Sequence, residues 1–512
     1  MAGQSEFTLK LGSIQPGPAV RRAADSAMRI LILGDFSGRG KTTTSVKLSE
    51  HSILQVDIDN FTTLMSRIAP ELLLPPGHSL AAQMSIEFQT IDDFHPDSLS
   101  QRVEIFQQFL QLHRQLMDPA SFEQAARQLR ENIKLNEHES ADSMNDVQEY
   151  AQEDDAATLD RLLGESSRQQ IPAAETGQNL ASRYISDIIA EYIVPETPPY
   201  RDLYIQAVDQ ALGARMRELL HHPDFQALEA AWRCLYMLVT ELESDETLSL
   251  HVLDISKQTL FDELDSADED LRSSSLYRLL VEQGVATYGG EPWSMLVGNY
   301  TFTTDSEDLS LLGKLGILAS HAGGPFLGAA DPGLLACKSL AESPNPHDWT
   351  VMDPQAAQHW QALRKNPAAA WIGLVLPRLL MRLPYGADTD PVDSFEFEEM
   401  PATQQHEAFL WGNPAFYCAL LLARSFAKQG WSMQPGDDLQ LDDQPAYIMQ
   451  QQGESGLQAC AEVFLSETAM EKILLQGIMP FISHRNRNIA RLARFQSIAE
   501  PLKALSGSWS QS

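Results

Sequence analysis

A compact apolar run, MRILIL, spans Met28 to Leu33 and ends at Gly34. A short run of this kind, closed by a glycine, is typical of a strand that is buried on both faces and leads into a loop. Strand patterns and helix patterns alternate along the chain beyond it. This alternation predicts an α/β or α+β fold, with mixed sheets and flanking helices.

The expected elements follow from the periodicity of the apolar residues, which is two in strands and about 3.6 in helices. Besides 28–33, the expected strands are 6–14, 85–88, 248–255 and 295–300, and SFEFEE at 394–399 alternates as a strand with one buried face. The expected helices are 98–129, with a second one starting after Pro119, then 180–193, 200–221, 225–239 with Asp224 as N-cap, and 257–264.

The chain has 512 residues, more than one hydrophobic core usually supports, so we expect several domains. Between Glu131 and Asn179 the composition shifts to Glu, Asp, Ser, Gln and Asn, interrupted by a short amphipathic patch at Leu159 to Leu163. Such a segment buries too little apolar surface to order itself. We therefore predict a domain at 1–130, an acidic flexible linker at 131–179, and one or more domains at 180–512.

The charge and the cysteines narrow the class of protein. Lys and Arg number 37 against 70 Asp and Glu, and the formal charge of -33 repels nucleic acid and anionic membranes. The four cysteines lie far apart without CxxC spacing, so neither a zinc site nor a disulfide framework is indicated. Neither a signal-peptide pattern nor a long uncharged apolar stretch is found. A cytoplasmic protein that neither binds nucleic acid nor inserts into a membrane is expected.

The loop GDFSGRGKTTT, Gly34 to Thr44, resembles a phosphate-binding P-loop because it is rich in glycine and follows an apolar strand. A Walker A loop requires glycine five residues before its Gly-Lys-Ser/Thr. Asp35 stands at that position, and Gly34 is one residue too early. A turn that leaves the sheet is therefore favoured over a nucleotide site.

Two clusters could hold a metal ion. His221, His222 and Asp224 form the first, but neighbouring residues on a helix point about 100° apart, which favours helix-entry packing. The second, IDDFHPD at 91–97, is better explained as a turn with Pro96 as the first helical residue and Asp97 in the first turn. Motifs of serine hydrolases, zincins and glycosidases are missing from the sequence. We predict no catalytic residue, no cofactor and no metal.

A basic segment, HRNRNIARLARF, spans His484 to Phe495 in this acidic chain. Its apolar residues Ile489, Leu492 and Phe495 recur at near-helical spacing. Its four arginines could meet an acidic neighbouring subunit, or they could pair with Asp and Glu of their own chain. Both interpretations stay open.

Several long motifs resemble the contractile sheath of type VI secretion. Residues 28–130 resemble the small sheath subunit (TssB/VipA-like) through RILILGDFSGR, VDIDNF and IEFQTIDDFHPD. Residues 158–498 resemble the large subunit (TssC/VipB-like, the EvpB family). The motifs there are HHPDFQALEAAWRCL, LPYGADTDPVDSFEFEE, LWGNPAF, CAEVFLSE and RLARFQSI. The motifs stand in the family's order, which makes the resemblance specific.

The resemblance implies a tail-sheath-like, multi-domain protein that is not an enzyme. Subunits of that family build a helical sheath around an inner tube of Hcp-like protein, on a baseplate, and contract to propel the tube and its effectors. An AAA+ unfoldase (ClpV-like) then takes the contracted sheath apart. The implied energy store is the metastable packing between subunits.

Two departures from the family open alternatives. Small and large subunits are ordinarily separate chains, and here an acidic linker joins them and moves the segment that engages the unfoldase to mid-chain, near Leu159 to Leu163. The chain also ends soon after Ile498, where large subunits usually continue into a strand-exchanging segment. The alternatives are a specialised component that starts, caps or docks a sheath, a soluble adaptor, and a P-loop-like NTPase using Gly34 to Thr44.

Overall fold

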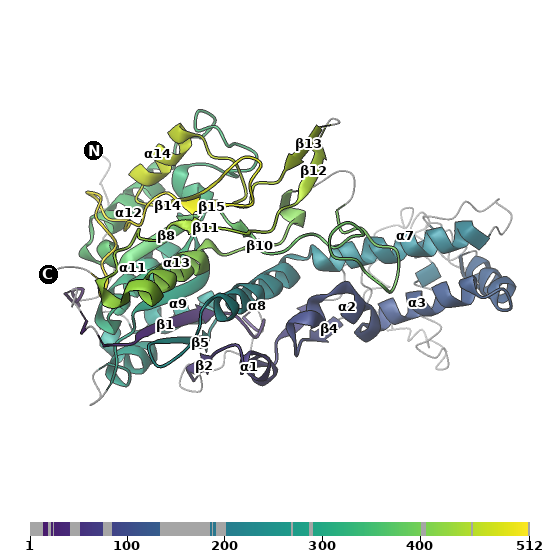
Figure 1. Ribbon diagram of the computed structural model, residues 1–512, viewed down its shortest axis with the longest axis horizontal. Helices are drawn as coiled ribbons and strands as arrows, with labels where there is room; N and C mark the ends of the chain where they lie inside the picture. The colour runs from purple at the N-terminus through teal and green to yellow at the C-terminus, as the bar shows by residue number, and fades with distance from the viewer. Residues whose placement is uncertain are drawn as a thin grey trace, which may run out of the picture.

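A nine-stranded mixed sheet forms the centre of the protein in the computed structural model (Figure 1). Its strand order is β11-β15-β14-β8-β7-β6-β1-β5-β2. The structure describes residues 14–18, 22–23, 25–40, 52–74, 84–133, 185–186, 188–190, 201–267, 270–285, 290–400, 406–451 and 454–509.

The strand β1 (Met28–Gly34) lies inside this sheet, as its apolar sequence predicts. It pairs in parallel with β5 (Leu248–Asp254) on one side and with β6 (Met295–Phe302) on the other. Alternate side chains point to opposite faces. Ile30 and Ile32 enter the core on one face and Leu31 enters the core on the other. Both faces of β1 are therefore buried.

The remaining strands extend the sheet on both sides and make it mixed. On one side, β2 (Leu54–Val56) runs antiparallel to β5. On the other side, β7, β8 and β14 continue the parallel part of the sheet. Beyond them, β15 runs antiparallel to β14, and β11 runs antiparallel to β15. These strands are β7 (Phe326–Ala330), β8 (Ile372–Leu376), β11 (Gln440–Leu441), β14 (Met479–Ser483) and β15 (Ala490–Leu492). The predicted mixed α/β class is confirmed.

Helices cover both faces of the sheet and make three layers (Figure 1). On one face, the helices α8 and α13 share a core with Ile30 and Ile32. On the other face, α9, α11 and α12 share a core with Leu31. These helices are α8 (Pro223–Glu241), α9 (Lys257–Ser266), α11 (Ser306–Ala322), α12 (Pro354–Lys365) and α13 (Pro414–Gln429).

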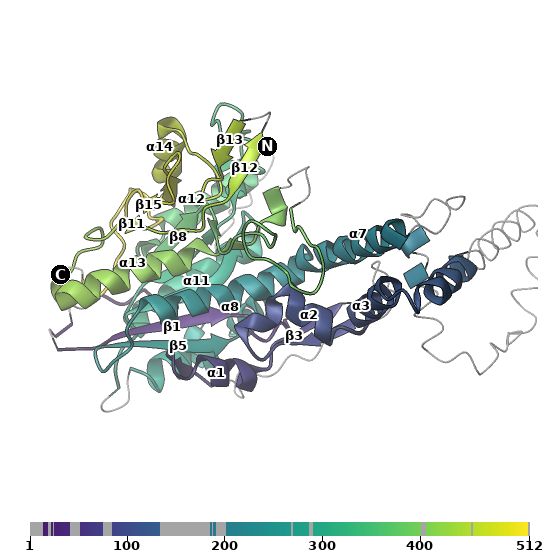
Figure 2. The same ribbon diagram turned by 45° about the vertical axis from the view of Figure 1, so that its right-hand side comes forward.

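A helical arm extends away from the sheet along the long axis of the molecule (Figures 1 and 2). It contains α7 (Arg201–Leu220), which precedes α8, and α3 (Glu104–Met117), which packs beside α7. The helix predicted over 98–129 is broken at Val103, whose extended backbone (φ -87°, ψ 122°) separates α2 (Pro96–Arg102) from α3. A further helix at 122–133 follows the turn at Asp118, as predicted.

Two His-Pro-Asp sequences begin helices in the same way. His222 is the N-cap of α8, and its Nδ1 accepts a hydrogen bond from the backbone N–H of Asp224 at 3.2 Å. His95 does the same for α2, with Asp97 as the donor. The prediction of Asp224 as N-cap is therefore wrong. Proline takes the first helical position, and the aspartate lies in the first turn, where its charge favours the helix dipole.

The other predicted elements had different outcomes. The strand at 85–88 is β4 (Met84–Glu87), which forms a hairpin with β3 (Glu71–Leu74). SFEFEE buries Phe395 and Phe397 and exposes Glu396 and Glu398, but it belongs to no strand, because it has no ladder partner. Residues 6–13 and 134–179 lie outside the described residues.

The remaining helices and strands are short. They are α1 (Phe61–Ile68), α10 (Ser275–Tyr277), β9 (Leu379–Leu380), β10 (Trp411–Gly412), β12 (Ile448–Gln451), β13 (Glu454–Leu457) and α14 (Glu467–Leu475).

The first 130 residues and the part of the chain after residue 200 share one sheet and one core. Besides the pairing of β1, Trp232 of α8 packs edge-on against Phe36 and Phe61, with ring centroids 5.4 Å and 5.7 Å away. The indole Nε1 of Trp232 donates a hydrogen bond to the carbonyl oxygen of Phe36 at 2.9 Å. The domain boundaries at 130 and 180 stay predictions, since residues 134–184 lie outside the described residues.

Cutting the chain between residues 140 and 175, at an inserted protease site, should leave the two parts associated. The ladders from β1 to β5 and β6 and the packing of Trp232 hold the parts together without the connecting peptide. Gel filtration of the cut protein in native buffer checks this, with denatured cut protein as the control. Two separately eluting fragments at micromolar concentration would contradict it.

Candidate functional site

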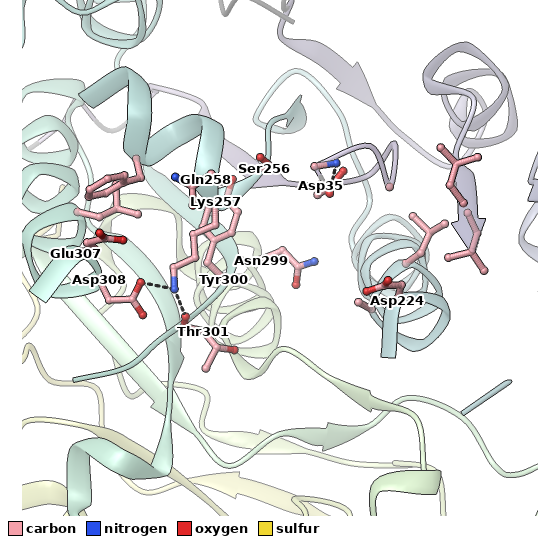
Figure 3. Close-up of a pocket in the computed structure, with 18 of the residues that line it drawn as sticks. Asp35, Asp224, Ser256, Lys257, Gln258, Asn299, Tyr300, Thr301, Glu307 and Asp308 are labelled. Carbon is pink, nitrogen blue, oxygen red and sulfur yellow. Dashed lines mark hydrogen bonds and ion pairs between the residues drawn. The ribbon is translucent and has the colours of Figure 1, made fainter. Parts of the chain in front are cut away.

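A pocket of about 1000 Å³ opens at the carboxyl ends of β1, β5 and β6 (Figure 3). This edge is where open α/β sheets usually bind their ligands. Leu72, Leu74 and Leu228 supply apolar lining, and Ser256 and Asn299 supply polar groups. The loop that was compared with a P-loop forms part of its wall.

The backbone amides of that loop already have partners inside the protein. The carboxylate Oδ1 of Asp254 accepts hydrogen bonds from the amides of Phe36 at 2.8 Å and Ser37 at 3.0 Å. The carboxylate Oδ2 of Asp35 accepts one from the amide of Gly40 at 2.9 Å. In a P-loop such amides bind phosphates. Here they hold the turn in place, although Lys41 to Thr44 lie outside the described residues.

The charges around the pocket are mainly negative. Asp35, Asp224, Glu307 and Asp308 line it, and Lys257 is the one basic residue among the described lining residues (Figure 3). The ammonium of Lys257 lies 2.6 Å from Asp308 Oδ1 and donates to the carbonyl of Thr301 at 2.7 Å. Burial, together with the neighbouring Asp254, raises the pKa of Asp35. A triphosphate would meet carboxylates here, which favours the turn over a nucleotide site.

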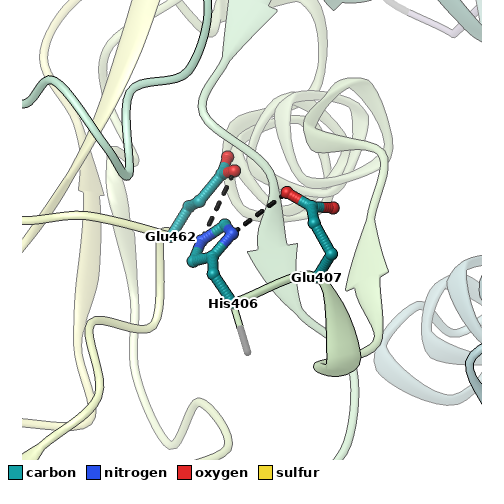
Figure 4. Close-up of side chains that lie close together, drawn as sticks. All are labelled: His406, Glu407 and Glu462. Atoms are coloured by element: carbon teal, nitrogen blue, oxygen red, sulfur yellow. Dashed lines mark hydrogen bonds and ion pairs between the residues drawn. The ribbon is translucent and has the colours of Figure 1, made fainter. Parts of the chain in front are cut away.

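A second cluster brings together His406, Glu407 and Glu462 (Figure 4). The ring Nδ1 of His406 lies 3.1 Å from Glu407 Oε1, and Nε2 lies 3.6 Å from Glu462 Oε1. One ligand atom from each residue falls within 4.8 Å of the others, which is the spacing of a metal site. Sequence reasoning missed this cluster, because Glu462 lies far along the chain from the other two.

A guanidinium already binds the two carboxylates of this cluster. Arg378, just after β8, donates to both carboxylate oxygens of Glu407 at 2.9 Å and 3.1 Å and to Glu462 Oε1 at 2.6 Å. The hydrogen bonds with His406 and Arg378 lower the pKa of Glu407 to about 2. The donor set is that of an ion-pair cluster, so we assign it no metal.

A buried ion-pair network ties α8 to the motif LPYGADTDPVDSFEFEE. Arg382 donates to Glu229 Oε1 at 2.8 Å and to Glu399 Oε2 at 2.7 Å, and all three side chains are almost fully buried. Arg233 also donates to Glu229, at 2.7 Å, and the backbone amide of Tyr385 donates to Glu399 at 2.7 Å. Buried charges of this kind are stable only while they are paired.

The other residues singled out from the sequence have structural roles, and the two segments that carry them pack together through Phe94 and Phe225, whose ring centroids are 5.7 Å apart. His222 caps α8, and His221 lies 3.7 Å from Glu399. In IDDFHPD, Asp93 accepts hydrogen bonds from the amides of Gln89 at 2.6 Å and Thr90 at 2.9 Å, and it pairs with Arg102 at 2.9 Å. Pro96 is the first helical residue, as predicted.

The basic segment at 484–495 forms a turn and the strand β15, so the helical spacing in its sequence was misleading. Ala490 and Leu492 alternate into the core because β15 pairs with β14 and β11. All four arginines of the segment are exposed, and none pairs with a carboxylate of the described residues. Within the described part of the chain, pairing with its own acids is therefore not observed. The arginines are Arg485, Arg487, Arg491 and Arg494.

Comparison with known proteins gives two family matches in succession along the chain. Residues 20–148 match the family described as "Type VI secretion system, VipA, VC_A0107 or Hcp2". Residues 202–499 match VipB, described as "EvpB/VC_A0108, tail sheath N-terminal domain". The chain is also 34% identical over 306 residues to the type VI secretion system sheath protein TssC1 of Pseudomonas aeruginosa. That alignment covers 58% of this chain and 61% of the length of TssC1.

Among the described residues, no helix has both the length and the apolar composition that a membrane span requires.

Magnesium ATP at millimolar concentration should not raise the melting temperature of the protein. The amides of Phe36, Ser37 and Gly40 are already bonded, and the pocket beside them is acidic. A ligand that binds only the native state would raise the melting temperature by mass action. Differential scanning fluorimetry with and without the nucleotide checks this, and a saturable rise would revive the NTPase alternative.

Replacing Glu399 with Gln should destabilise the protein by about 3 kcal/mol near neutral pH. Burial raises the pKa of Glu399, but the charge of Arg382 and the hydrogen bonds from Arg382 and Tyr385 outweigh it and lower the pKa to about 2 from the usual 4.5. A lowered pKa stabilises the fold above about pH 4.5, and this contribution is lost as the pH falls toward 2.

Urea unfolding across this pH range measures the effect. The free energies of unfolding of the wild type and Glu399→Gln should differ most above about pH 4.5 and converge as the pH falls toward 2. The exposed neighbour Glu398, replaced with Gln, is the matched control and should change little. A difference that does not depend on pH would contradict the assignment of the charge pair.

Proposed function

We propose that this chain, which belongs to the family of type VI secretion tail sheath proteins, is a structural subunit of a contractile sheath. It has a small-subunit region and a large-subunit region in one polypeptide. The observation that carries the proposal is the succession of the two family matches along one chain. The strand β1, from the first matched region, pairs with β5 and β6 of the second. A small and a large subunit thus correspond to one folded unit here.

Joining the two regions supports assembly at one-to-one stoichiometry. A covalent tie makes the pairing of β1 intramolecular and raises the effective concentration of one region for the other. The packing of Trp232 on Phe36 and Phe61 then completes a core that neither region supplies alone. The unit that enters a sheath would be this complete three-layer body.

The proposed role is mechanical, and it does not require catalysis. The polar groups at the carboxyl edge of the sheet are bonded to one another: Asp254 and Asp35 to loop amides, Lys257 to Asp308 and Arg378 to two glutamates. Because these groups are already bonded within the protein, their role is to stabilise the fold. The work of contraction would come from two alternative packings between subunits.

The proposed partners follow from the family. They are other sheath subunits, an inner tube of Hcp-like protein, a baseplate and an AAA+ unfoldase (ClpV-like), in the bacterial cytoplasm. The segment at Leu159 to Leu163, which the unfoldase would engage, lies outside the described residues. A specialised component that starts, caps or docks a sheath remains the second candidate, because this chain joins regions that are ordinarily separate subunits.

Negative-stain electron microscopy of the purified full-length protein tests the proposal. We expect tubules or cogwheel-like rings, either from the protein alone or after mixing with its cognate tube protein, since a sheath subunit must bind copies of itself. The tube protein alone is the control. Monomers or small oligomers in both samples would contradict the sheath-subunit proposal and favour the specialised component or an adaptor.

A further inference from the structure

Three arginines form an exposed basic surface at the far end of the sheet. Arg485 and Arg487 lie in the turn after β14, and Arg491 lies on β15, and we call these three side chains the arginine surface. Across the strands, Arg491 stands beside Ile482 of β14 and exposed Gln440 of β11, so it points away from the core. The ladder of β15 therefore fixes the direction of Arg491.

The arginine surface has no acidic partner among the described residues, although acids outnumber bases in this chain by 70 to 37. Arg485 instead lies over the ring of Phe464, with its guanidinium carbon 5.6 Å from the ring centroid. Three exposed guanidiniums, close together in the sequence, are therefore free to pair with carboxylates of another molecule.

The acidic pocket described above has the opposite imbalance. Glu307 is exposed and has no ion-pair partner among the described residues, and Lys257 is already paired with Asp308. Partial burial and the neighbouring charge of Asp254 together raise the pKa of Asp35. Another cation entering the pocket would relieve this repulsion.

The two sites lie along the same edge of the sheet but too far apart to meet within one molecule. The strands β14, β8, β7, β6 and β1 run parallel, so the turn after β14 and the pocket beyond β6 are both at carboxyl ends. Three strand spacings separate β14 from β6, which is roughly 14 Å. An ion pair cannot span that distance, and salt screens charges beyond about 8 Å.

We propose that, in the assembled protein, the arginine surface of one copy docks against the acidic pocket of a second copy. This inference rests on the proposed function, since it assumes that copies of the chain bind one another. Carboxylates accept two hydrogen bonds from one guanidinium, and the apolar lining at Leu72 and Leu228 suits the aliphatic stem of an arginine. A second copy fits better than nucleic acid, which the charge of -33 repels.

Reversing the charges on each side separately, and then on both, tests the contact. Arg485→Glu with Arg487→Glu makes the arginine surface acidic, and Glu307→Lys with Gln258→Lys makes the pocket basic. Both of the latter positions are exposed on the pocket wall. Each double variant alone should assemble about tenfold more slowly at low salt than the wild type, as measured by light scattering with the tube protein.

An equal mixture of the two double variants should recover assembly to within about threefold of the wild type. In the mixture, every acidic surface can face a basic pocket, and every wild-type surface a wild-type pocket. The chain that carries all four substitutions should recover in the same way. Circular dichroism melting of each variant excludes loss of fold as the cause.

A control variant separates this contact from a general effect of charge. Arg114→Glu with Arg127→Glu changes the net charge as much as the arginine-surface variant, at exposed sites on the helical arm, and should assemble like the wild type. If the wild type assembles and the mixture does not recover, the contact is wrong while the sheath proposal stands. If the wild type does not assemble, the proposed function fails, and the contact fails with it.

Discussion

The ladder that β1 makes with β5 on one side and β6 on the other is the constraint on which the rest of the structure depends. Without β1 these two strands have no common neighbour, and the helices above and below lose the surface on which they pack. The contact is also long in sequence, because Met28 lies beside Leu248. Bringing these strands together costs the entropy of closing a long loop, and this cost grows only slowly with the length of the loop. The fused arrangement therefore suits a sheet whose central strand comes from the first region.

Electrostatics organises the carboxyl edge of this sheet. Loop amides and cations are matched to carboxylates at the turn after β1, around Lys257, and around Arg378. The buried network around Arg382 follows the same rule between α8 and the chain after β9. Pairs of this kind add little net stability compared with an apolar core, but an unpaired member is costly. Their effect is to fix one arrangement of the segments that meet at this edge.

Two sites on the same edge depart from that pattern, the acidic pocket and the exposed arginines of the turn after β14. Each has an excess of one sign of charge, and the geometry of the parallel strands keeps them apart within a molecule. In the proposed sheath subunit, complementary sites of this kind would set the register between copies, because mismatched charges would face one another in any other arrangement. On this proposal, one edge of the sheet serves both the fold and the assembly.

The sequence by itself determined the buried strand β1, the helices with a clear 3.6-residue period, the failed P-loop spacing and the family, because each rests on local pattern or on motifs in order. Only the tertiary structure decided that SFEFEE has no ladder partner, that the segment ending at Phe495 forms β15 and not a helix, and that His222 caps α8 in place of Asp224. It alone brought Arg378 to its two glutamates. These outcomes depend on which distant strand or side chain lies alongside, and a local pattern carries no information about that neighbour.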